Sequence, residues 1–280
     1  MRKLLAANFS RLWRSKNFWV LEALSAIAGA VVYILAIINT KNIDESWYLF
    51  NGNYYFFIVL VYIGAIMAVF SSFYIGTEYS DGTIRNKLNV GSCRNSIYLA
   101  NLVVVVTAGV LFAITQMLAS IAVGLPFLGS LIWQALSLVG WRIVVALVMI
   151  LCYGSVFTFF GMMDSNKSRS LLISFVLALA IIFGGLFTTS RLNEPELTSR
   201  MVMQADGSYQ REFNLPNSRY ISGTTRTIYI FVDACIPASQ SFNIARSEGE
   251  FNMLAIICQL CVTALFTGAG LASFKKKDIK

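Results

Sequence analysis

The sequence contains no histidine, and only 13% of its 280 residues are charged. The absence of histidine excludes His-dependent proteases and the usual catalytic triads, and it removes a common ligand of zinc sites. A soluble domain has about 25% charged residues, so the low charge content is typical of a chain embedded in lipid. The mean hydropathy of +0.67 agrees with this interpretation. We predict an integral membrane protein.

The sequence also lacks a nucleotide-binding loop. No GxxxxGK[ST] pattern occurs in it, so the chain cannot cradle nucleotide phosphates in that way. We expect no catalytic residue, no metal ligand and no cofactor on this chain. If it takes part in active transport, ATP is hydrolysed on another polypeptide.

The five cysteines do not form the pattern of a disulfide framework. Cys235 is the only one that we place outside the membrane, whereas Cys93 and Cys152 lie inside or within it. Cys258 and Cys261 have CxxC spacing but fall in an apolar run. We expect them to be buried small hydrophobic residues rather than a metal or redox pair.

Six apolar runs approach or exceed the roughly 20 residues that cross a bilayer as a helix. We predict spans at Phe18–Ile38, Tyr54–Ile75, Ile97–Val123, Trp141–Met163, Leu171–Thr189 and Phe251–Ala272. With the N-terminus inside, the four inner segments carry 14 Lys and Arg, and the two short outer loops carry only Lys41. This asymmetry obeys the positive-inside rule and predicts that both termini are cytoplasmic. The net charge of +8 therefore sets topology, and we expect no nucleic-acid partner.

Residues 1–17 form a basic amphipathic segment before the first span. Helical spacing places apolar residues on one face, opposite the cations: Leu5, Phe9, Leu12 and Trp13. We predict an interfacial helix that anchors the chain in the headgroup region of the membrane lipid. A generic positive-inside anchor is the alternative.

Residues 190–250 form a predicted extracellular segment, the only part of the chain with the composition of a soluble domain. Within it, Thr227–Pro237 is apolar but too short to cross the membrane. We predict a helix that dips into the outer leaflet and turns at Pro237. Gly124–Gly140, which contains Pro126, is predicted to be an interfacial or partly inserted segment.

Glu22 and Arg142 are the ionisable residues within or at the edge of the predicted spans. Such residues are functional candidates, but both are near enough to an interface for their side chains to reach water. We expect structural roles for them. An ion-coupled carrier usually has mid-membrane acids or paired broken helices, and neither pattern is clear here.

The stretch EYSDGTIRNKLNVGSCR, residues 78–94, is a polar island between the second and third spans. Asp81-Gly82 is a turn signal, Thr83 can cap a short helix that ends near Val90, and Gly91 can stop it. Ser92 can then open the next helix. An ordinary structured loop is the alternative interpretation.

The short helix has an apolar stripe with cations beside it. Ile84 and Leu88 lie one turn apart, and Arg85 and Lys87 flank them. This pattern is typical of an element that docks onto another body.

The segment EYSDGTIRNKLNVGSCRNSIYLAN resembles the one that follows the second span in permeases of ATP-binding-cassette (ABC) transporters of the second export type. The stretches FSRLWRSKNFW, NSRYISGTTRTIYIFVDACIPASQ and FKKKDIK are also similar to that family. The chain departs from the family at Asn101, where many members carry Lys. The positions in the first segment that match the family pattern are Glu78, Gly82, Thr83, Arg85, Leu88 and Arg94.

The resemblance implies a six-span half-transporter that pairs with a second, identical or related permease chain and with two ATPase subunits, which would hold ATP and Mg. In such permeases the first inner loop contains a coupling helix that sits in a groove of the ATPase. Here Asp81 and Gly82 would set its angle, Thr83 would cap it, and Ile84 and Leu88 would fill the groove. The residues expected to pair at the rim of the groove are Glu78, Arg85 and Lys87. The N-terminal helix would be an interfacial connector, and the outer segment before the last span would be re-entrant.

We therefore predict an all-α membrane protein in which residues 1–280 form one transmembrane permease domain. It would be the membrane subunit of an exporter in a bacterial plasma membrane, not itself an enzyme. Its substrate would be amphipathic or hydrophobic (a peptide, drug or lipid), moved by alternating access. The alternative is a stand-alone ion-coupled transporter or a membrane receptor, which a neighbouring gene for a P-loop ATPase would disfavour.

Overall fold

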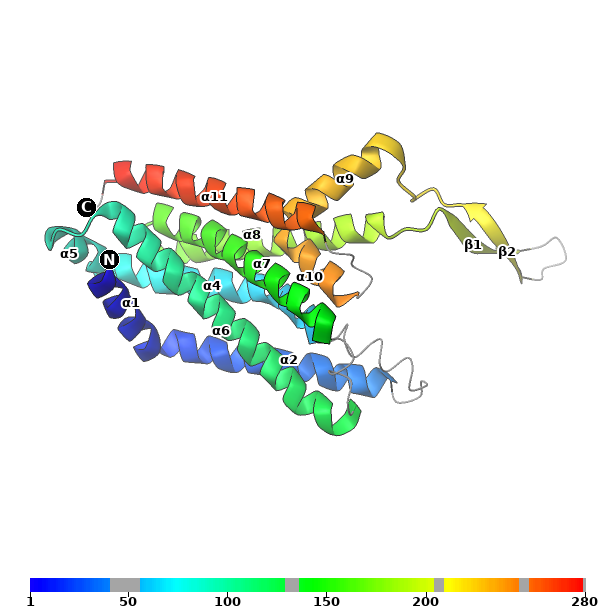
Figure 1. Cartoon of the computed structure of the whole chain (residues 1–280), viewed down its shortest axis with the longest axis horizontal. Coiled ribbons are helices and arrows are strands. Elements are labelled where there is room, and N and C mark those ends of the chain that lie inside the picture. The colour runs from blue at the N-terminus through cyan, green and yellow to red at the C-terminus, as the bar shows by residue number, and fades with distance from the viewer. Residues whose placement is uncertain (41–55, 129–135, 204–208, 247–251, 279–280) are drawn as a thin grey trace.

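The computed structural model describes residues 1–40, 56–128, 136–203, 209–246 and 252–278. Long helices run side by side along the horizontal axis of Figure 1, and both termini lie at the same end. A pair of strands projects from the opposite end. We call these two ends of the bundle the terminal end and the hairpin end.

Six helical stretches are long and apolar enough to cross a membrane. This confirms the prediction of an all-α membrane protein with six spans. Most of the helices extend a few residues beyond the predicted limits, and Tyr54 and Phe251, where two predicted spans begin, lie outside the described residues. The stretches belong to α2 (Lys16–Thr40), η1 (Val59–Tyr62) with α4 (Ile63–Ser80), α6 (Arg94–Leu128), α7 (Leu136–Met163), α8 (Lys167–Leu192) and α11 (Met253–Lys276).

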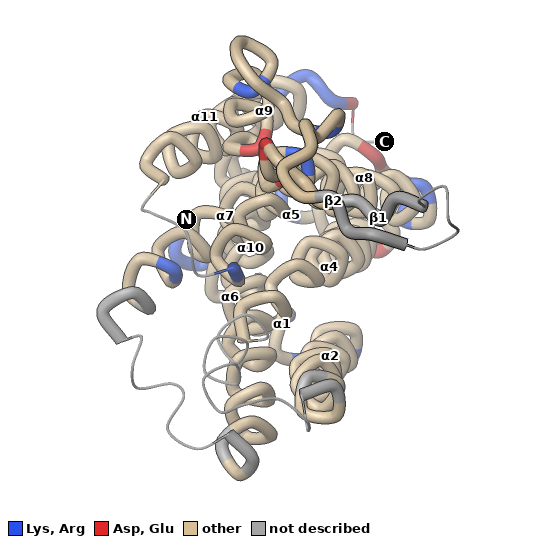
Figure 2. The backbone as a smooth tube through the Cα atoms, turned by 90° about the vertical axis from the view of Figure 1, so that its right-hand side faces the viewer, with Lys and Arg blue, Asp and Glu red and all other residues tan. Residues whose placement is uncertain are grey.

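The spans pack around α4. It contacts α6, α7 and α8, while α2 packs mainly on α6 and α11 mainly on α7. In the end-on view of Figure 2, α2 lies at one side of the bundle and α11 near the other. The outward faces of α2, α8 and α11 are rich in exposed apolar side chains, as expected of helices that face lipid.

Aromatic rings and close helix contacts build the core. The ring of Phe18 lies 6.2 Å from that of Phe70 and 5.6 Å from that of Phe112, which fastens the start of α2 to α4 and α6. At the α6–α11 contact a Cβ on Gly270 would lie 2.1 Å from the hydroxyl of Tyr98. Small residues allow membrane helices to approach this closely.

Helix α1 (Arg2–Arg14) lies across the terminal end and meets α2 at Ser15, which has an extended backbone. Only part of the apolar face of α1 that was predicted to contact lipid is exposed. Leu12 is fully buried in the protein core, Leu5 and Phe9 are half-buried, and Trp13 is exposed. Leu12 therefore packs against the chain itself, because α1 folds back onto α6.

The segment Gly124–Gly140 begins and ends as continuations of spans. Helix α6 runs through Pro126 to Leu128, and α7 begins at Leu136. A helix that stays intact keeps its backbone groups paired, which matters most in apolar surroundings. The candidate spans end at Gly124 and begin again at Gly140, so the interfacial position of this segment stays a prediction, and residues 129–135 lie outside the described part.

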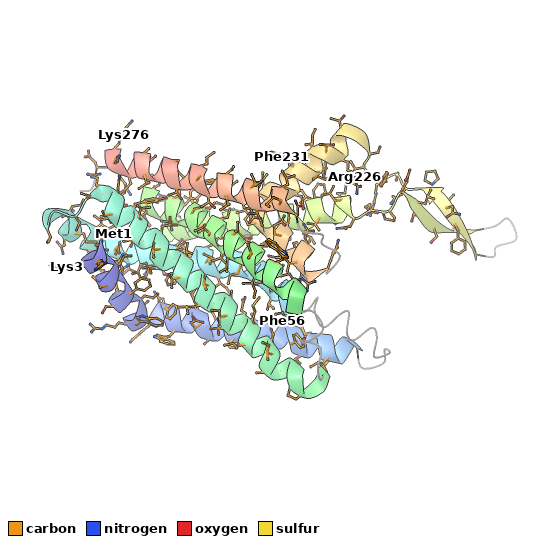
Figure 3. The ribbon with its side chains drawn as sticks, in the orientation of Figure 1. Met1, Lys3, Phe56, Arg226, Phe231 and Lys276 are labelled. Carbon is orange, nitrogen blue, oxygen red and sulfur yellow. The ribbon has the colours of Figure 1, made fainter. Side chains whose placement is uncertain are left out.

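The hairpin end holds two strands and a helix of the predicted extracellular segment. Strands β1 (Leu197–Met203) and β2 (Tyr209–Pro216) pair antiparallel, a hairpin that the sequence did not lead us to expect. Helix α9 (Gly223–Cys235) leans away from the bundle in Figure 1, with Arg226 and Phe231 labelled on it in Figure 3.

Helix α10 (Pro237–Ala245) follows α9 and packs on α7 and α8. The break between the two helices falls where the turn at Pro237 was predicted. The re-entrant position of this pair in a membrane stays a prediction.

Candidate functional site

The polar island forms a tight turn and a short helix at the terminal end. Helix α4 ends at Ser80, the amide of Asp81 donates to the carbonyl of Thr77 at 2.9 Å, and Gly82 has a left-handed φ of 65°. The predicted Asp81-Gly82 turn is therefore confirmed. Thr83 is already the first residue of α5 (Thr83–Asn89), and no side-chain hydrogen bond caps that helix. The prediction that Thr83 caps α5 is wrong, because Gly82 occupies the cap position.

The other end of α5 closes with the stop predicted at Gly91. Gly91 has a φ of 83°, its amide donates to the carbonyl of Leu88 at 2.9 Å, and the amide of Ser92 donates to that of Lys87 at 3.0 Å. These two bonds form a Schellman motif, which satisfies the last carbonyls of a helix. Helix α6 then begins at Arg94. Cys93, and not the predicted Ser92, is therefore the residue that precedes the helix.

The apolar stripe of α5 faces its own chain. Ile84 has 1% of its surface exposed and belongs to the hydrophobic core, and Leu88 packs against the same core. Ile84 is therefore not available to fill a partner's groove in this arrangement, whereas for the partly exposed Leu88 that role stays a prediction. The exposed residues of α5 are instead Arg85, Asn86 and Asn89, and Val90, which directly follows the helix, is 87% exposed.

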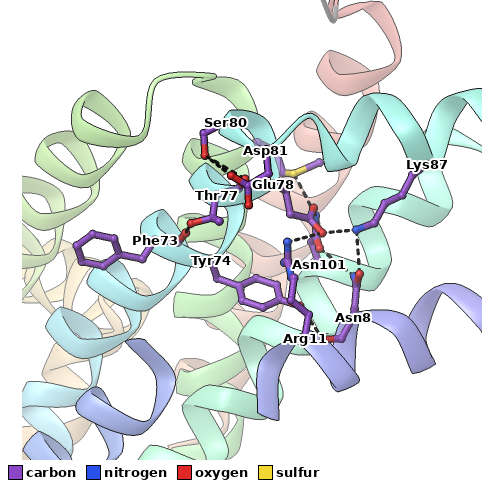
Figure 4. Close-up of polar contacts among 11 residues, drawn as sticks. Asn8, Arg11, Phe73, Tyr74, Thr77, Glu78, Ser80, Asp81, Lys87 and Asn101 are labelled. Carbon is purple, nitrogen blue, oxygen red and sulfur yellow. Dashed lines mark hydrogen bonds and ion pairs between the residues drawn. The ribbon is translucent and has the colours of Figure 1, made fainter. Parts of the chain in front are cut away.

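Glu78, in the last turn of α4, is the centre of a buried polar network (Figure 4). None of its surface is exposed. Its Oε1 pairs with Nη1 of Arg11 at 2.9 Å and with Nζ of Lys87, and its Oε2 accepts from Nδ2 of Asn101 at 2.7 Å. Glu78 thereby joins α4 to α1, α5 and α6.

Asn8 closes the network from α1. Its Nδ2 donates to Oδ1 of Asn101 at 3.0 Å, and its Oδ1 accepts from Nζ of Lys87 at 2.8 Å. The hydroxyl of Tyr74 donates to the backbone carbonyl of Asn8 at 2.9 Å. Hydrogen bonds and ion pairs therefore connect the side chains that link the four helices, although Nε and Nη2 of Arg11 have no hydrogen-bond partner among the described residues.

Two of the three residues predicted at a partner's rim lie in this network. Glu78 is enclosed and Lys87 is largely so, which leaves Arg85 as the exposed member of the three. Burial lowers the pKa of Lys87, while the carboxylate of Glu78 opposes that shift. Cations beside a buried carboxylate offset the cost of removing it from water, and for Glu78 the chain supplies them itself.

Four members of the network were not identified as site residues from the sequence: Asn8, Arg11, Tyr74 and Asn101. One signal was present for Asn8, which lies three residues after Leu5 and four before Leu12, on the apolar face of α1. A polar residue on such a face needs a hydrogen-bonding partner. Asn101, where the resemblance led us to expect Lys, carries an amide that donates to Glu78.

A second set of contacts fastens the end of α11 beside α5. Nη1 of Arg94 donates to the carbonyls of Phe274 and Lys277, and thus caps α11. Nζ of Lys277 donates to the carbonyl of Met162 at 2.8 Å and to the hydroxyl of Tyr79 at 2.9 Å. The C-terminal segment is therefore held against α4, α6 and α7.

At the hairpin end Asp233 joins α8, α9 and α10. It is 5% exposed, and its Oδ1 accepts from the hydroxyls of Thr188 at 2.8 Å and Thr189 at 2.9 Å. Its Oδ2 accepts from Nδ2 of Asn243 at 3.0 Å. Hydrogen bonds thus satisfy this buried carboxylate, which explains an acid among the apolar residues at the end of α9.

The prediction that the side chains of Glu22 and Arg142 reach water is wrong. They are 8% and 9% exposed, because neighbouring spans enclose them. The guanidinium carbon of Arg142 lies 5.0 Å from the ring centroid of Phe57, a cation–π contact that fits a structural role.

The cysteines of the described part are free. Cys258 is buried as expected, whereas Cys261 is exposed on the outward face of α11. Cys235 packs beside Cys258, although the two lie on different helices. Among the described residues no three His, Cys, Asp or Glu side chains form a group that could hold a metal ion.

A family model described as ABC-2 family transporter protein matches residues 4–185. The chain belongs to the ABC-2 transporter family. The match includes α5 and every residue of the Glu78 network, and the hairpin and α9 to α11 lie beyond it. Membrane proteins of the ABC-2 family are transport subunits and not themselves catalytic. No curated protein and no solved structure matches the chain.

Proposed function

We propose that this ABC-2 family protein is the permease subunit of an ABC exporter in a bacterial plasma membrane. Two permease chains would pair with two separate ATPase subunits, which bind ATP and Mg. Alternating access, driven by ATP binding and hydrolysis on those subunits, would move an amphipathic or hydrophobic substrate outward. The terminal end would be cytoplasmic and the hairpin end extracellular.

The form of α5 is the observation that carries the proposal. Its start is set by Gly82 and its end by the Schellman motif at Gly91, so the helix is fixed at both ends. Directly after its last residue, Asn89, the side chain of Val90 is 87% exposed. An exposed apolar side chain with a charge nearby suits a protein partner, since apolar contacts supply much of the affinity and rim charges supply orientation.

The Glu78 network supports a mechanical role for α5. It ties α5 through Lys87 to α1, α4 and α6. A partner that binds α5 differently in two states can shift the membrane part between two arrangements only if α5 is coupled to the spans. The network provides that coupling, and Ile84 adds an apolar contact with the core.

The proposal is tested with the complex formed with the candidate ATPase. Val90→Asp and Arg85→Glu alter the outward surface of α5 without touching the core, so both should reduce recovery of the ATPase in a pull-down and reduce substrate-stimulated ATP hydrolysis. Lys275→Gln, at an exposed position of the same end, is the matched control and should leave both unchanged. If Val90→Asp and Arg85→Glu behave like Lys275→Gln, α5 is not the contact with the ATPase.

Membership of the ABC-2 family favours this function over a stand-alone carrier or receptor. A reconstituted permease that moves substrate with an ion gradient and without any ATPase would establish the alternative instead.

A further inference from the structure

A cavity of about 230 Å³ lies at the terminal end, between the junction of α1 with α2 and one face of α4. Arg11 and Arg14 from α1 and Ser15 at the junction form one part of its lining. Phe70 and Phe73 of α4 form another part. The cavity therefore combines cations with aromatic rings, and it is distinct from the outward surface of α5.

Arg14 is the cation of this cavity that is free to bind. It is exposed and forms no ion pair within the described chain. Arg11 pairs through Nη1 with Glu78, its guanidinium carbon lies 3.7 Å from the ring centroid of Tyr74, and its Nε and Nη2 are enclosed by the protein. Arg11 therefore adds positive charge beside the cavity, while Arg14 can donate directly to an anion.

The backbone adds to the attraction for an anion. Helix α2, of 25 residues, begins at Lys16, and both Ser15 and Asn17 line the cavity. The first amides of a helix and its dipole attract phosphate groups. The guanidinium groups and the start of α2 therefore favour the same kind of ligand.

The position of the cavity indicates the source of the phosphate. Trp13 and Trp19 lie at the same junction, both exposed, and Nε1 of Trp19 donates to the carbonyl of Trp13 at 2.9 Å. Exposed indoles are enriched at the level of lipid headgroups. The cavity is smaller than the roughly 300–1,000 Å³ of a site for a drug-sized ligand, which suits a headgroup whose acyl chains remain in the membrane.

Asp81 also lines the cavity and is exposed. Its carboxylate would repel a second negative charge but attract an ammonium group. We propose that the cavity binds the headgroup of one ethanolamine phospholipid, with its phosphate at Arg11 and Arg14 and its ammonium group at Asp81. This site would fix the junction of α1 and α2 at the membrane surface.

Native mass spectrometry of the purified full chain, titrated with phosphatidylethanolamine, tests the proposal. The wild-type chain should bind one such lipid, and Arg14→Gln should weaken binding about tenfold, the effect expected for loss of one charge-assisted hydrogen bond. Arg2→Gln, at an exposed position of the same helix, is the control and should bind like the wild type. Equal melting temperatures would exclude misfolding as the cause.

Two further titrations identify the ligand. Phosphatidylglycerol should bind the wild type more weakly than phosphatidylethanolamine, and Asp81→Asn should abolish that difference. Inorganic phosphate should not displace the lipid; displacement would make this a site for a free anion and overturn the proposal. Equal binding of the two lipids by the wild type, or equal effects of Arg14→Gln and Arg2→Gln, would overturn it as well. None of these measurements requires the ATPase, so their outcome is independent of the exporter function.

Discussion

Glu78 shares one fully buried carboxylate between Arg11 and Lys87. Glu78→Gln keeps the shape of the side chain but leaves the two cations without their anion. Removing one partner of a buried ion pair costs about 3–5 kcal/mol, so we expect a clear drop in the melting temperature of the purified protein. Glu196→Gln, at an exposed acid, should melt like the wild type. Equal melting of the two variants would show that the network does not stabilise the fold.

Substitutions at Gly82 test backbone strain alone, because a new side chain there would not clash with a neighbour. Its φ is 65°, and a Cβ added there would have no neighbour within 4 Å. Gly82→Val should therefore destabilise the turn by about 1–3 kcal/mol through its dihedral angles alone. Gly82→Asn should cost less, because asparagine tolerates the left-handed region. The measurement is thermal unfolding together with ATPase recovery, and equal values for Val and Asn would contradict the left-handed turn.

At the scale of elements, the end of α11 should respond to pH through Lys277. Burial lowers the pKa of Lys277 to about 8, whereas an exposed lysine titrates near pH 10.4. Between these values the unfolded chain holds more protons than the folded one, so the contribution of this group to stability rises with pH. Below about pH 8 both states are charged, and that contribution is least favourable.

The wild type should therefore gain melting temperature between pH 8 and 10 relative to Lys277→Met, which lacks the group. Lys276→Met, at the exposed neighbouring position, should follow the wild type across this range. Parallel curves for the wild type and Lys277→Met would mean that burial does not lower the pKa of Lys277 in the folded protein.

The elements that the sequence predicted well are those set by local patterns. Apolar length placed the six spans, and two glycines with positive φ marked both ends of α5. The sequence could not predict which surface the apolar stripe of α5 packs against. The spacing of Ile84 and Leu88 shows that a stripe exists, but not whether the same chain or a partner covers it. The network was missed for a similar reason, since its bond between Asn8 and Asn101 joins residues 93 positions apart.

At the scale of the whole molecule, the positive-inside pattern predicts opposite sides of the membrane for the two ends of the bundle. Cys93 is exposed at the terminal end, and Ser218→Cys places a thiol at an exposed position of the hairpin end. In single-cysteine variants, an impermeant maleimide applied to whole cells should label position 218 and spare Cys93. Labelling of Cys93 alone would reverse the orientation.

Cys235 is a poor reporter for that experiment. It packs beside Cys258, and burial raises the pKa of Cys235 to about 11. Since the thiolate is the reactive form, Cys235 would react slowly from either side of the membrane.

The β1–β2 hairpin consists of only two strands, so each strand keeps one edge without a neighbouring strand in the described chain. Open edges of this kind can add a strand from another molecule. Detergent covers the apolar surface of the helices once the protein has been extracted, whereas β1 and β2 project from the bundle (Figure 1). In concentrated preparations, self-association of the protein should therefore begin at the hairpin and not at the apolar surface of the helices.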